Sequence, residues 1–155
     1  MSNRNRGELV AAVTATARRH HAAYTLFNQA MAERLGLHPT DLQCVSLLVL
    51  EPGPRTTGEI AELTGLTSGS ATRLVDRLQK AGLAERHPDA RDRRKMLVTL
   101  TPDRNPEIEA AWEAPGEAFD RALDDFTEDE LAVVERYLQR TTDVGAVQTA
   151  RLRAG

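Results

Sequence analysis

The sequence predicts a mainly α-helical protein with a small β-hairpin, an α+β fold in which helices flank the hairpin on both sides along the chain. Apolar residues recur every three or four positions along most of the 155 residues, which is the period of an amphipathic helix. Two strand-like runs, 83–87 and 95–101, flank a charged turn. Glycine stops and capping residues separate the helical runs at short intervals.

The first two helices are expected at 8–35 and 39–50. Gly36 stops the first helix, and Pro39 suits the first turn of the second. Residues 39–50 are so uniformly apolar that this helix should be central and buried. The apolar stripe of the first helix consists of Val13, Ala17, His20, Tyr24, Phe27, Met31 and Leu35.

The middle of the chain has the order of a helix-turn-helix followed by a wing. Thr56 and Glu59 have the spacing of a capping box, which predicts a short helix that Gly65 ends. A three-residue turn, 65–67, then leads into a helix over 68–81, and Gly82 stops it. The basic hairpin follows at once. This arrangement places its second helix in the major groove of DNA.

The C-terminal part returns to a helical pattern. A helix is expected over about 107–126, and Pro115-Gly116 should break or kink it. Thr127 and Glu130 form a second capping box, from which the last helix should run to about residue 142. The tail from Val144 is expected to fray.

Charge is divided along the chain, although the net value is −3. Residues 52–100 hold nine Lys/Arg against six Asp/Glu, whereas residues 101–143 hold four Arg against thirteen acids. The basic segment is therefore the one that suits a polyanion. No apolar run approaches the roughly 20 residues that cross a bilayer, and no signal-like block is present. We expect a cytoplasmic protein without a membrane partner.

Five sequence blocks resemble the successive signatures of the MarR family of bacterial winged-helix transcriptional regulators. They are 58–61, 70–78, 82–86, 89–94 and 100–102, each at the family's spacing from the next. The resemblance implies an obligate homodimer whose first and last helices interlock, pseudo-palindromic operator DNA, and release by a small ligand or by oxidation. It divides the chain into an N-terminal dimerisation helix (1–38), a winged helix-turn-helix (39–102) and C-terminal dimerisation helices with a tail (103–155). Residues 103–106 replace the family's usual Lys-Gly and should delay the next helix.

The tip of the second helix is the predicted DNA reader. Small and polar residues there let the backbone approach the groove, although Ser68 and Ser70 could equally cap the helix. Arg73 can bind guanine O6 and N7 together, hold a phosphate, or pair with Asp76. Asp76 is interpreted as a partner for Arg73 or for a wing arginine rather than as a base reader. Arg77, one turn further along, should contact phosphate. The candidate DNA-binding residues of this part are Thr56, Thr67, Ser68, Gly69, Ser70, Thr72, Arg73 and Arg77.

The hairpin tip supplies a second group of candidates: Arg91, Arg93 and Arg94. Guanidinium groups suit a narrow minor groove, where negative potential is concentrated. Asp89 and Asp92 should brace one or two of these arginines and fix the hairpin. The resemblance assigns Arg94 to bracing or phosphate contact and Arg91 or Arg93 to the groove.

The remaining candidates concern regulation. His20, Tyr24 and Phe27 share one face of the first helix and could bind a small aromatic or lipophilic effector, or simply pack at the dimer interface. Cys44, the single cysteine, lies on the apolar helix and is interpreted as a core residue rather than a peroxide sensor. No phosphate loop, zinc-binding helix or nucleophile elbow is present, so no metal, cofactor or enzymatic activity is expected.

Together these patterns predict a homodimeric repressor that binds two half-sites about one helical turn apart. Recognition helices should enter the major groove, and wings the minor groove. Two alternatives remain open. One is a redox-responsive regulator that switches through Cys44, and the other is a helical adaptor that binds protein.

Overall fold

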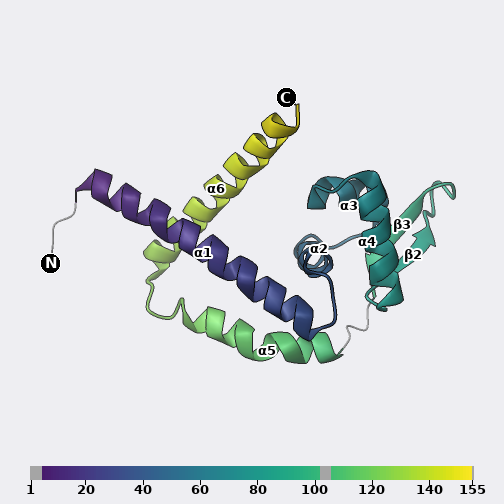
Figure 1. The fold of residues 1–155 in the computed structure, drawn as a ribbon, viewed down its shortest axis with the longest axis horizontal. Coiled ribbons are helices and arrows are strands. Elements are labelled where there is room, and N and C mark those ends of the chain that lie inside the picture. Colours follow the sequence, from purple (N-terminus) through teal and green to yellow (C-terminus); the bar gives the residue numbers. More distant parts are fainter. Residues whose placement is uncertain (1–4, 102–105, 155) are drawn as a thin grey trace. The chain divides into compact units, whose positions relative to one another are not determined.

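The computed structural model describes residues 5–101 and 106–154 and confirms a mainly helical fold with a small antiparallel sheet (Figure 1). The chain divides into two compact units, Met1–Ala111 and Trp112–Gly155. The elements are, in order, α1 (Arg6–Arg34), α2 (Pro39–Leu50), β1 (Arg55–Thr56), α3 (Thr57–Thr64), α4 (Ser68–Lys80), β2 (Ala84–Pro88), β3 (Met96–Leu100), α5 (Pro106–Arg121) and α6 (Glu128–Ala154).

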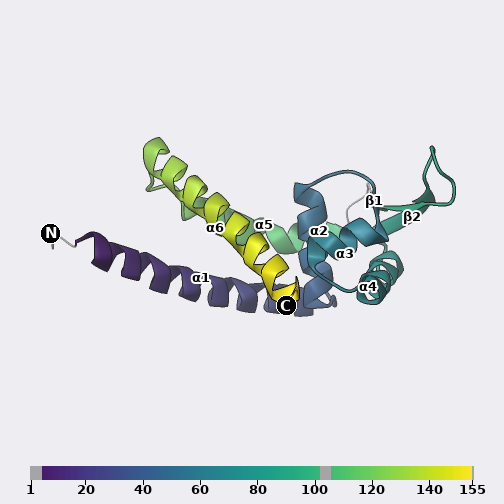
Figure 2. The same ribbon diagram turned by 90° about the horizontal axis from the view of Figure 1, so that it is seen from above.

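The sheet of the first unit has three antiparallel strands in the order β1-β3-β2. Val98 of β3 pairs with Arg55 on one side and with Arg86 on the other, and its side chain is buried. The two-residue strand β1 was not expected from the sequence. The hairpin formed by β2, the tip and β3 is called the wing below, and Figure 2 shows it reaching beyond α3 and α4.

The core of the first unit lies where α2, α3 and α4 pack against this sheet. On α4, buried residues recur at 71, 74, 75 and 78, so that one face is covered and the other is left to solvent. This amphipathic pattern is the one that the sequence predicts. The core cluster is Cys44, Leu48, Ile60, Leu74, Val75, Leu78, Leu83, Ala84 and Val98.

The capping prediction for α3 is confirmed. The Thr56 hydroxyl accepts a bond from the Glu59 N–H, and the Glu59 carboxylate accepts one from the Thr56 N–H at 2.6 Å. These bonds from Thr56 hold the pKa of Glu59 below its ordinary value. Gly65 ends α3 at φ 70°, a left-handed conformation that glycine adopts without steric cost. Both ends of α3 are therefore fixed by local chemistry.

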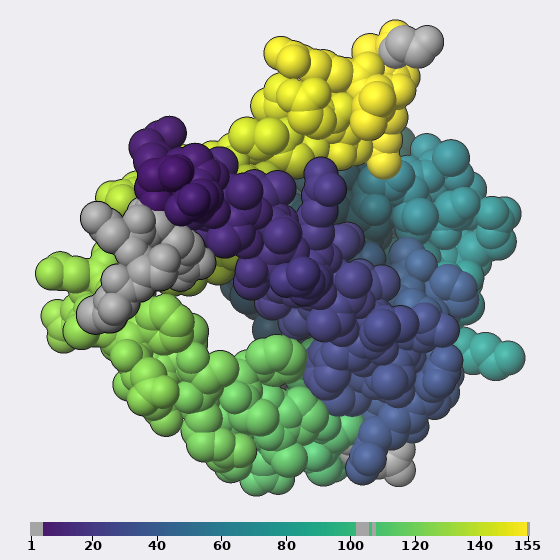
Figure 3. Space-filling view, turned by 60° about the vertical axis from the view of Figure 1, so that its left-hand side comes forward, coloured from purple at the N-terminus to yellow at the C-terminus, as the bar shows by residue number. Residues whose placement is uncertain are grey.

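Helix α1 contacts the rest of the first unit mainly through its C-terminal end. Met31 and Ala32 are its buried residues, whereas Val13 and Tyr24 are 48% and 42% exposed. Figures 1 and 2 show the helix projecting away from α2, and Figure 3 shows its side chains at the surface. The predicted apolar stripe is thus present, but one copy of the chain leaves Val13, His20 and Tyr24 exposed.

Two sequence expectations for the second unit are wrong. Helix α5 continues through Pro115 instead of breaking there, and α6 runs to Ala154 instead of ending near residue 142. A kink at Pro115 stays a prediction. A proline removes one backbone hydrogen bond, and the alanines and glutamates around it are strong helix formers. Gly145 costs a helix only about 1 kcal/mol, which the alanine-rich tail tolerates.

The expected delay after residue 102 concerns residues 103–105, which lie outside the described residues. Pro106 itself is the first residue of α5. None of the helices in the described ranges combines the length and the apolar character that crossing a bilayer requires.

Candidate nucleic-acid interface

The first turns of α4 present a small, polar surface. Ser68, Gly69 and Thr72 are exposed, and a Cβ added at Gly69 would meet nothing within 4 Å. The N-cap of α4 is Thr67, whose hydroxyl accepts a bond from the Ser70 N–H at 3.3 Å. Capping is thus the role of Thr67 rather than of Ser68 or Ser70. The helix start therefore offers open backbone N–H groups to an anion.

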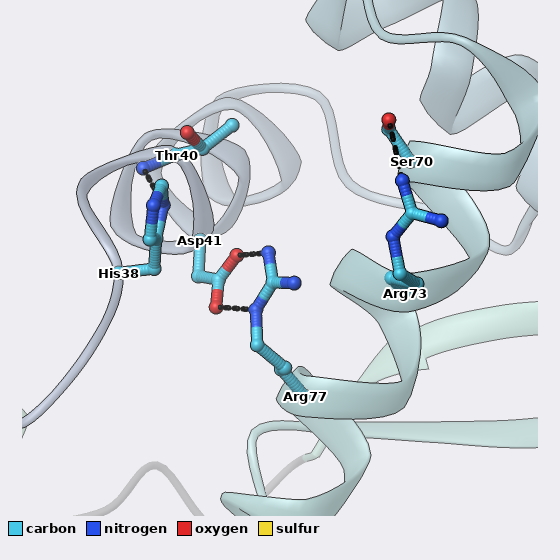
Figure 4. A network of polar contacts seen from close by, with 6 residues as sticks. All are labelled: His38, Thr40, Asp41, Ser70, Arg73 and Arg77. Atoms are coloured by element: carbon cyan, nitrogen blue, oxygen red, sulfur yellow. Dashed lines mark hydrogen bonds and ion pairs between the residues drawn. The ribbon is translucent and has the colours of Figure 1, made fainter.

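Arg73 extends from the exposed side of α4 (Figure 4). Its Nη2 donates to the Ser70 hydroxyl at 3.2 Å. Within the described part of the chain no carboxylate pairs with it, because the expected partner Asp76 binds another arginine. The guanidinium is therefore held in place by a neutral group and keeps its charge for an external anion.

Arg77 makes a contact that the sequence did not reveal. Its Nε and Nη2 donate to the two oxygens of Asp41 at 2.7 and 2.6 Å, a fork-like pair between α4 and α2 (Figure 4). The Asp41 side chain is 3% exposed, whereas that of Arg77 is 46% exposed. The bond from Asp41 raises the pKa of Arg77, although burial opposes this effect. A phosphate contact by the rest of the guanidinium stays a prediction.

The signal for this pair was Asp41 itself. Asp41 is the one acidic residue of a helix that the sequence predicts to be buried, and a buried carboxylate without a cation is very costly. The local pattern does not say which cation, because Arg77 lies 36 residues away.

The wing tip divides its arginines between bracing and exposure. Asp92 accepts a bond from the Arg94 Nε at 3.1 Å, and this contact lowers the pKa of Asp92. Asp89 accepts from the Arg91 backbone N–H at 2.8 Å. The prediction that the aspartates brace one or two wing arginines is confirmed for Arg94. The side chains of Arg91 and Arg93 are exposed and have no carboxylate partner among residues 5–101 and 106–154.

The base of the wing is joined to α4 by Arg86. Its Nη1 donates to the Asp76 carboxylate at 2.6 Å and also to the Gln79 side-chain oxygen. The expectation that Asp76 pairs with an arginine is thus met by a residue of β2, which the sequence did not single out. The sequence feature that could have indicated Arg86 is its position two residues after the buried Ala84, because alternate residues of a strand share one face.

The aromatic side chains of α1 form a row. The ring centroids of His20 and Tyr24 are 6.0 Å apart, as are those of Tyr24 and Phe27. Such a row suits either a small aromatic molecule or another apolar surface. An effector at these residues stays a prediction.

Cys44 is fully buried, which confirms its interpretation as a core residue. Burial, and after it the charge of Asp41, raises the pKa of the thiol to about 11. We therefore expect the native protein to resist a thiol reagent near neutral pH and to react once it is unfolded in denaturant. Thiol titration of both states measures this, with Cys44→Ala as the blank. Rapid modification of the native protein would favour the redox alternative.

Comparison with known proteins places this geometry in a family. The family model described as MarR family matches residues 35–95. The chain is 36% identical over 154 residues to the HTH-type transcriptional regulator YcgE of Bacillus subtilis, and the match covers 99% of both chains. It is 33% identical over 109 residues to the multiple antibiotic resistance protein MarR of Salmonella typhimurium, which covers 67% of this chain and 76% of that protein.

A solved structure shows the same fold. A MarR family protein from Bacillus stearothermophilus superposes with a TM-score of 0.68 at 24% identity, over 90% of this chain and 97% of that one. The helix-turn-helix, the wing and these matches agree. The chain therefore belongs to the MarR family and is a helix-turn-helix transcriptional regulator, not an enzyme.

Proposed function

We propose that the protein is a homodimeric repressor that binds a pseudo-palindromic operator, with α4 in the major groove and the wing in the minor groove. One observation carries this proposal. Arg73 on α4 and Arg91 and Arg93 on the wing are exposed and have no carboxylate partner in the described ranges, although acidic residues outnumber basic ones by 23 to 20. Cations left unpaired in an acidic protein suit an external polyanion.

The homodimer is supported by apolar side chains that one chain leaves exposed. On α1 these are Leu9, Val10, Val13 and Leu26, each 45% exposed or more. Helix α6 has no buried residue among those described, and it exposes Val133, Tyr137, Leu138, Val144, Val147 and Leu152. Apolar side chains repeated along two long helices favour association over solvation. A second copy would supply the second α4 that a palindrome needs.

Repression follows from occupancy, since a dimer bound over two half-sites excludes other proteins from the same DNA. Release by a small aromatic or lipophilic molecule is supported by the aromatic row on α1, which starts one turn from the buried end of that helix. Packing of the same rings in the dimer interface is the alternative use of this row.

A footprint over the DNA just upstream of the protein's own gene tests the proposal. We expect two protected half-sites about one helical turn apart, with weaker protection at higher salt. A protein that proves to be a monomer and prefers no duplex at low ionic strength would refute the proposal.

Arg73→Ala is expected to weaken operator binding by about 1–3 kcal/mol, roughly 5- to 150-fold, and to relax the base preference at one position in each half-site. The reason is the loss of a bidentate guanidinium. Titration of duplexes that vary at single positions measures both effects. Arg73→Lys is the matched control, because it keeps the charge but not the fork. If lysine restores full binding and all sequences weaken equally, Arg73 contacts phosphate instead of a base.

A further inference from the structure

The wing and α4 must reach two different grooves of one duplex, so that the angle between them matters as much as the groups they carry. Strand β1 pairs with β3 through Thr56 and Leu97 and fixes the base of the sheet. The hydrogen bonds of the tip lie within the hairpin, as from the Asp89 N–H to the Lys95 carbonyl at 2.9 Å. A contact from β2 to α4 is therefore well placed to set the direction of the wing.

Arg86 provides that contact. It lies two residues after Ala84, so that both share the strand face that is buried against α4. At this position the strand leaves the core, and an arginine can cover the boundary with its aliphatic stem while its guanidinium stays polar. The side chain is 23% exposed, and the guanidinium reaches Asp76 and Gln79, which lie one turn apart on α4.

The chemistry of the contact suits a rigid joint better than a DNA contact. Both hydrogen bonds leave one nitrogen, Nη1, whose two N–H groups are fixed in the guanidinium plane, so that the two acceptors orient this plane; the N–H groups of an ammonium rotate about its last bond and give no such orientation. Asp76, in turn, is 57% exposed on the α4 face next to Arg73. A carboxylate there repels phosphate, so its presence on a DNA-reading face calls for a role other than backbone binding.

We propose that Arg86 is a positioning residue that locks the wing to α4 through Asp76 and Gln79, so that Arg73 and the wing arginines engage adjacent grooves together. This inference rests on the proposed DNA-binding function. It assigns to Arg86 no contact with DNA. Its consequence is that the wing arginines contribute to affinity only while the lock is intact.

A double-mutant cycle tests this coupling. Four proteins are titrated with a labelled duplex of the protected upstream sequence: the unmodified protein, Arg91→Ala/Arg93→Ala, Arg86→Met, and the variant that combines all three changes. Methionine keeps the stem of Arg86 and removes its guanidinium. Independent sites add to within about twofold. We expect the wing pair to weaken the unmodified protein strongly but to weaken the Arg86→Met protein by no more than about twofold. An equal loss in both backgrounds would overturn the inference and leave the proposed function standing.

Two further variants separate positioning from simple charge. If Arg86 binds phosphate, Arg86→Lys restores affinity; if it is the lock, lysine does not. Asp76→Ala removes both a negative charge and the acceptor of the Arg86 hydrogen bond. On charge alone it would tighten binding, whereas loss of the lock abolishes the contribution of the wing pair. Asp76→Ala also carries the test if melting curves show that Arg86→Met does not fold. If the wing pair has no effect on the unmodified protein, the proposed function fails, and this inference fails with it.

Discussion

Between about 50 and 200 mM salt, operator affinity is expected to fall by about 10³–10⁵, the range for a protein that makes roughly 6–10 phosphate contacts. The physical reason is the release of counterions from DNA when arginines and lysines neutralise phosphates. Titrations at several salt concentrations give the slope of log affinity against log salt. A binding constant that does not depend on salt would contradict a DNA-binding role for α4 and the wing.

The wing arginines allow this slope to be assigned to a place on the protein. Replacing Arg91 and Arg93 by alanine should reduce the slope by about one for each phosphate that the wing no longer neutralises. The matched control combines Arg121→Ala with Arg136→Ala, which lowers the net charge of the chain by the same two units. Arg121 lies on α5 and pairs with Glu117 at 3.3 Å. If both changes move the slope equally, overall charge and not the wing governs binding.

Arg77→Met is expected to lower the free energy of unfolding by about 3 kcal/mol, the lower end of the range for breaking a buried ion pair. The cost arises because Asp41, 3% exposed, is left as a buried carboxylate without its cation. The lower end applies because the Arg77 side chain is 46% exposed and the pair is therefore partly solvated. Denaturant unfolding near neutral pH measures the change.

Replacing the other partner of the pair should cost less stability. Asp41→Asn removes the buried charge and leaves Arg77, which water can reach, so we expect a smaller loss than for Arg77→Met. Adding Asp41→Asn to Arg77→Met should recover part of the lost stability. Equal and additive losses would show that the pair contributes packing rather than charge compensation.

The local features of the fold could be predicted from the sequence because each depends on a few neighbouring residues. The bounds of α2 follow from Pro39 and the turn after Leu50, and the start of α3 follows from Thr56 and Glu59. Left-handed glycines mark the ends of α3 and α4, at Gly65 and just after the C-cap of α4. A stop signal can nevertheless be outweighed by its neighbours, as Pro115 inside α5 demonstrates.

The candidate site was predictable in part. Ion pairs between residues that are distant in the sequence could not be predicted. The sequence indicated which arginines face solvent on α4 and the wing tip, since helix period and hairpin position decide this. It did not indicate that Arg77 binds Asp41 or that Arg86 binds Asp76. These residues are distant in the sequence, and they come within hydrogen-bond distance only because the helices and the sheet pack together. The bracing of a wing arginine by an aspartate could be predicted, because the two residues that pair, Asp92 and Arg94, are only two positions apart.

The neighbouring residues Asp76 and Arg77 bind opposite supports, one the wing and the other α2. Any attempt to redesign the operator preference of this regulator must therefore leave both residues unchanged. Replacing either would shift α4 and, with it, the side chains that contact bases. The positions that can be randomised without disturbing the packing of α4 are the exposed ones near the start of that helix: Ser68, Gly69, Thr72 and Arg73. A library confined to these four should yield new sequence preferences in proteins that still fold.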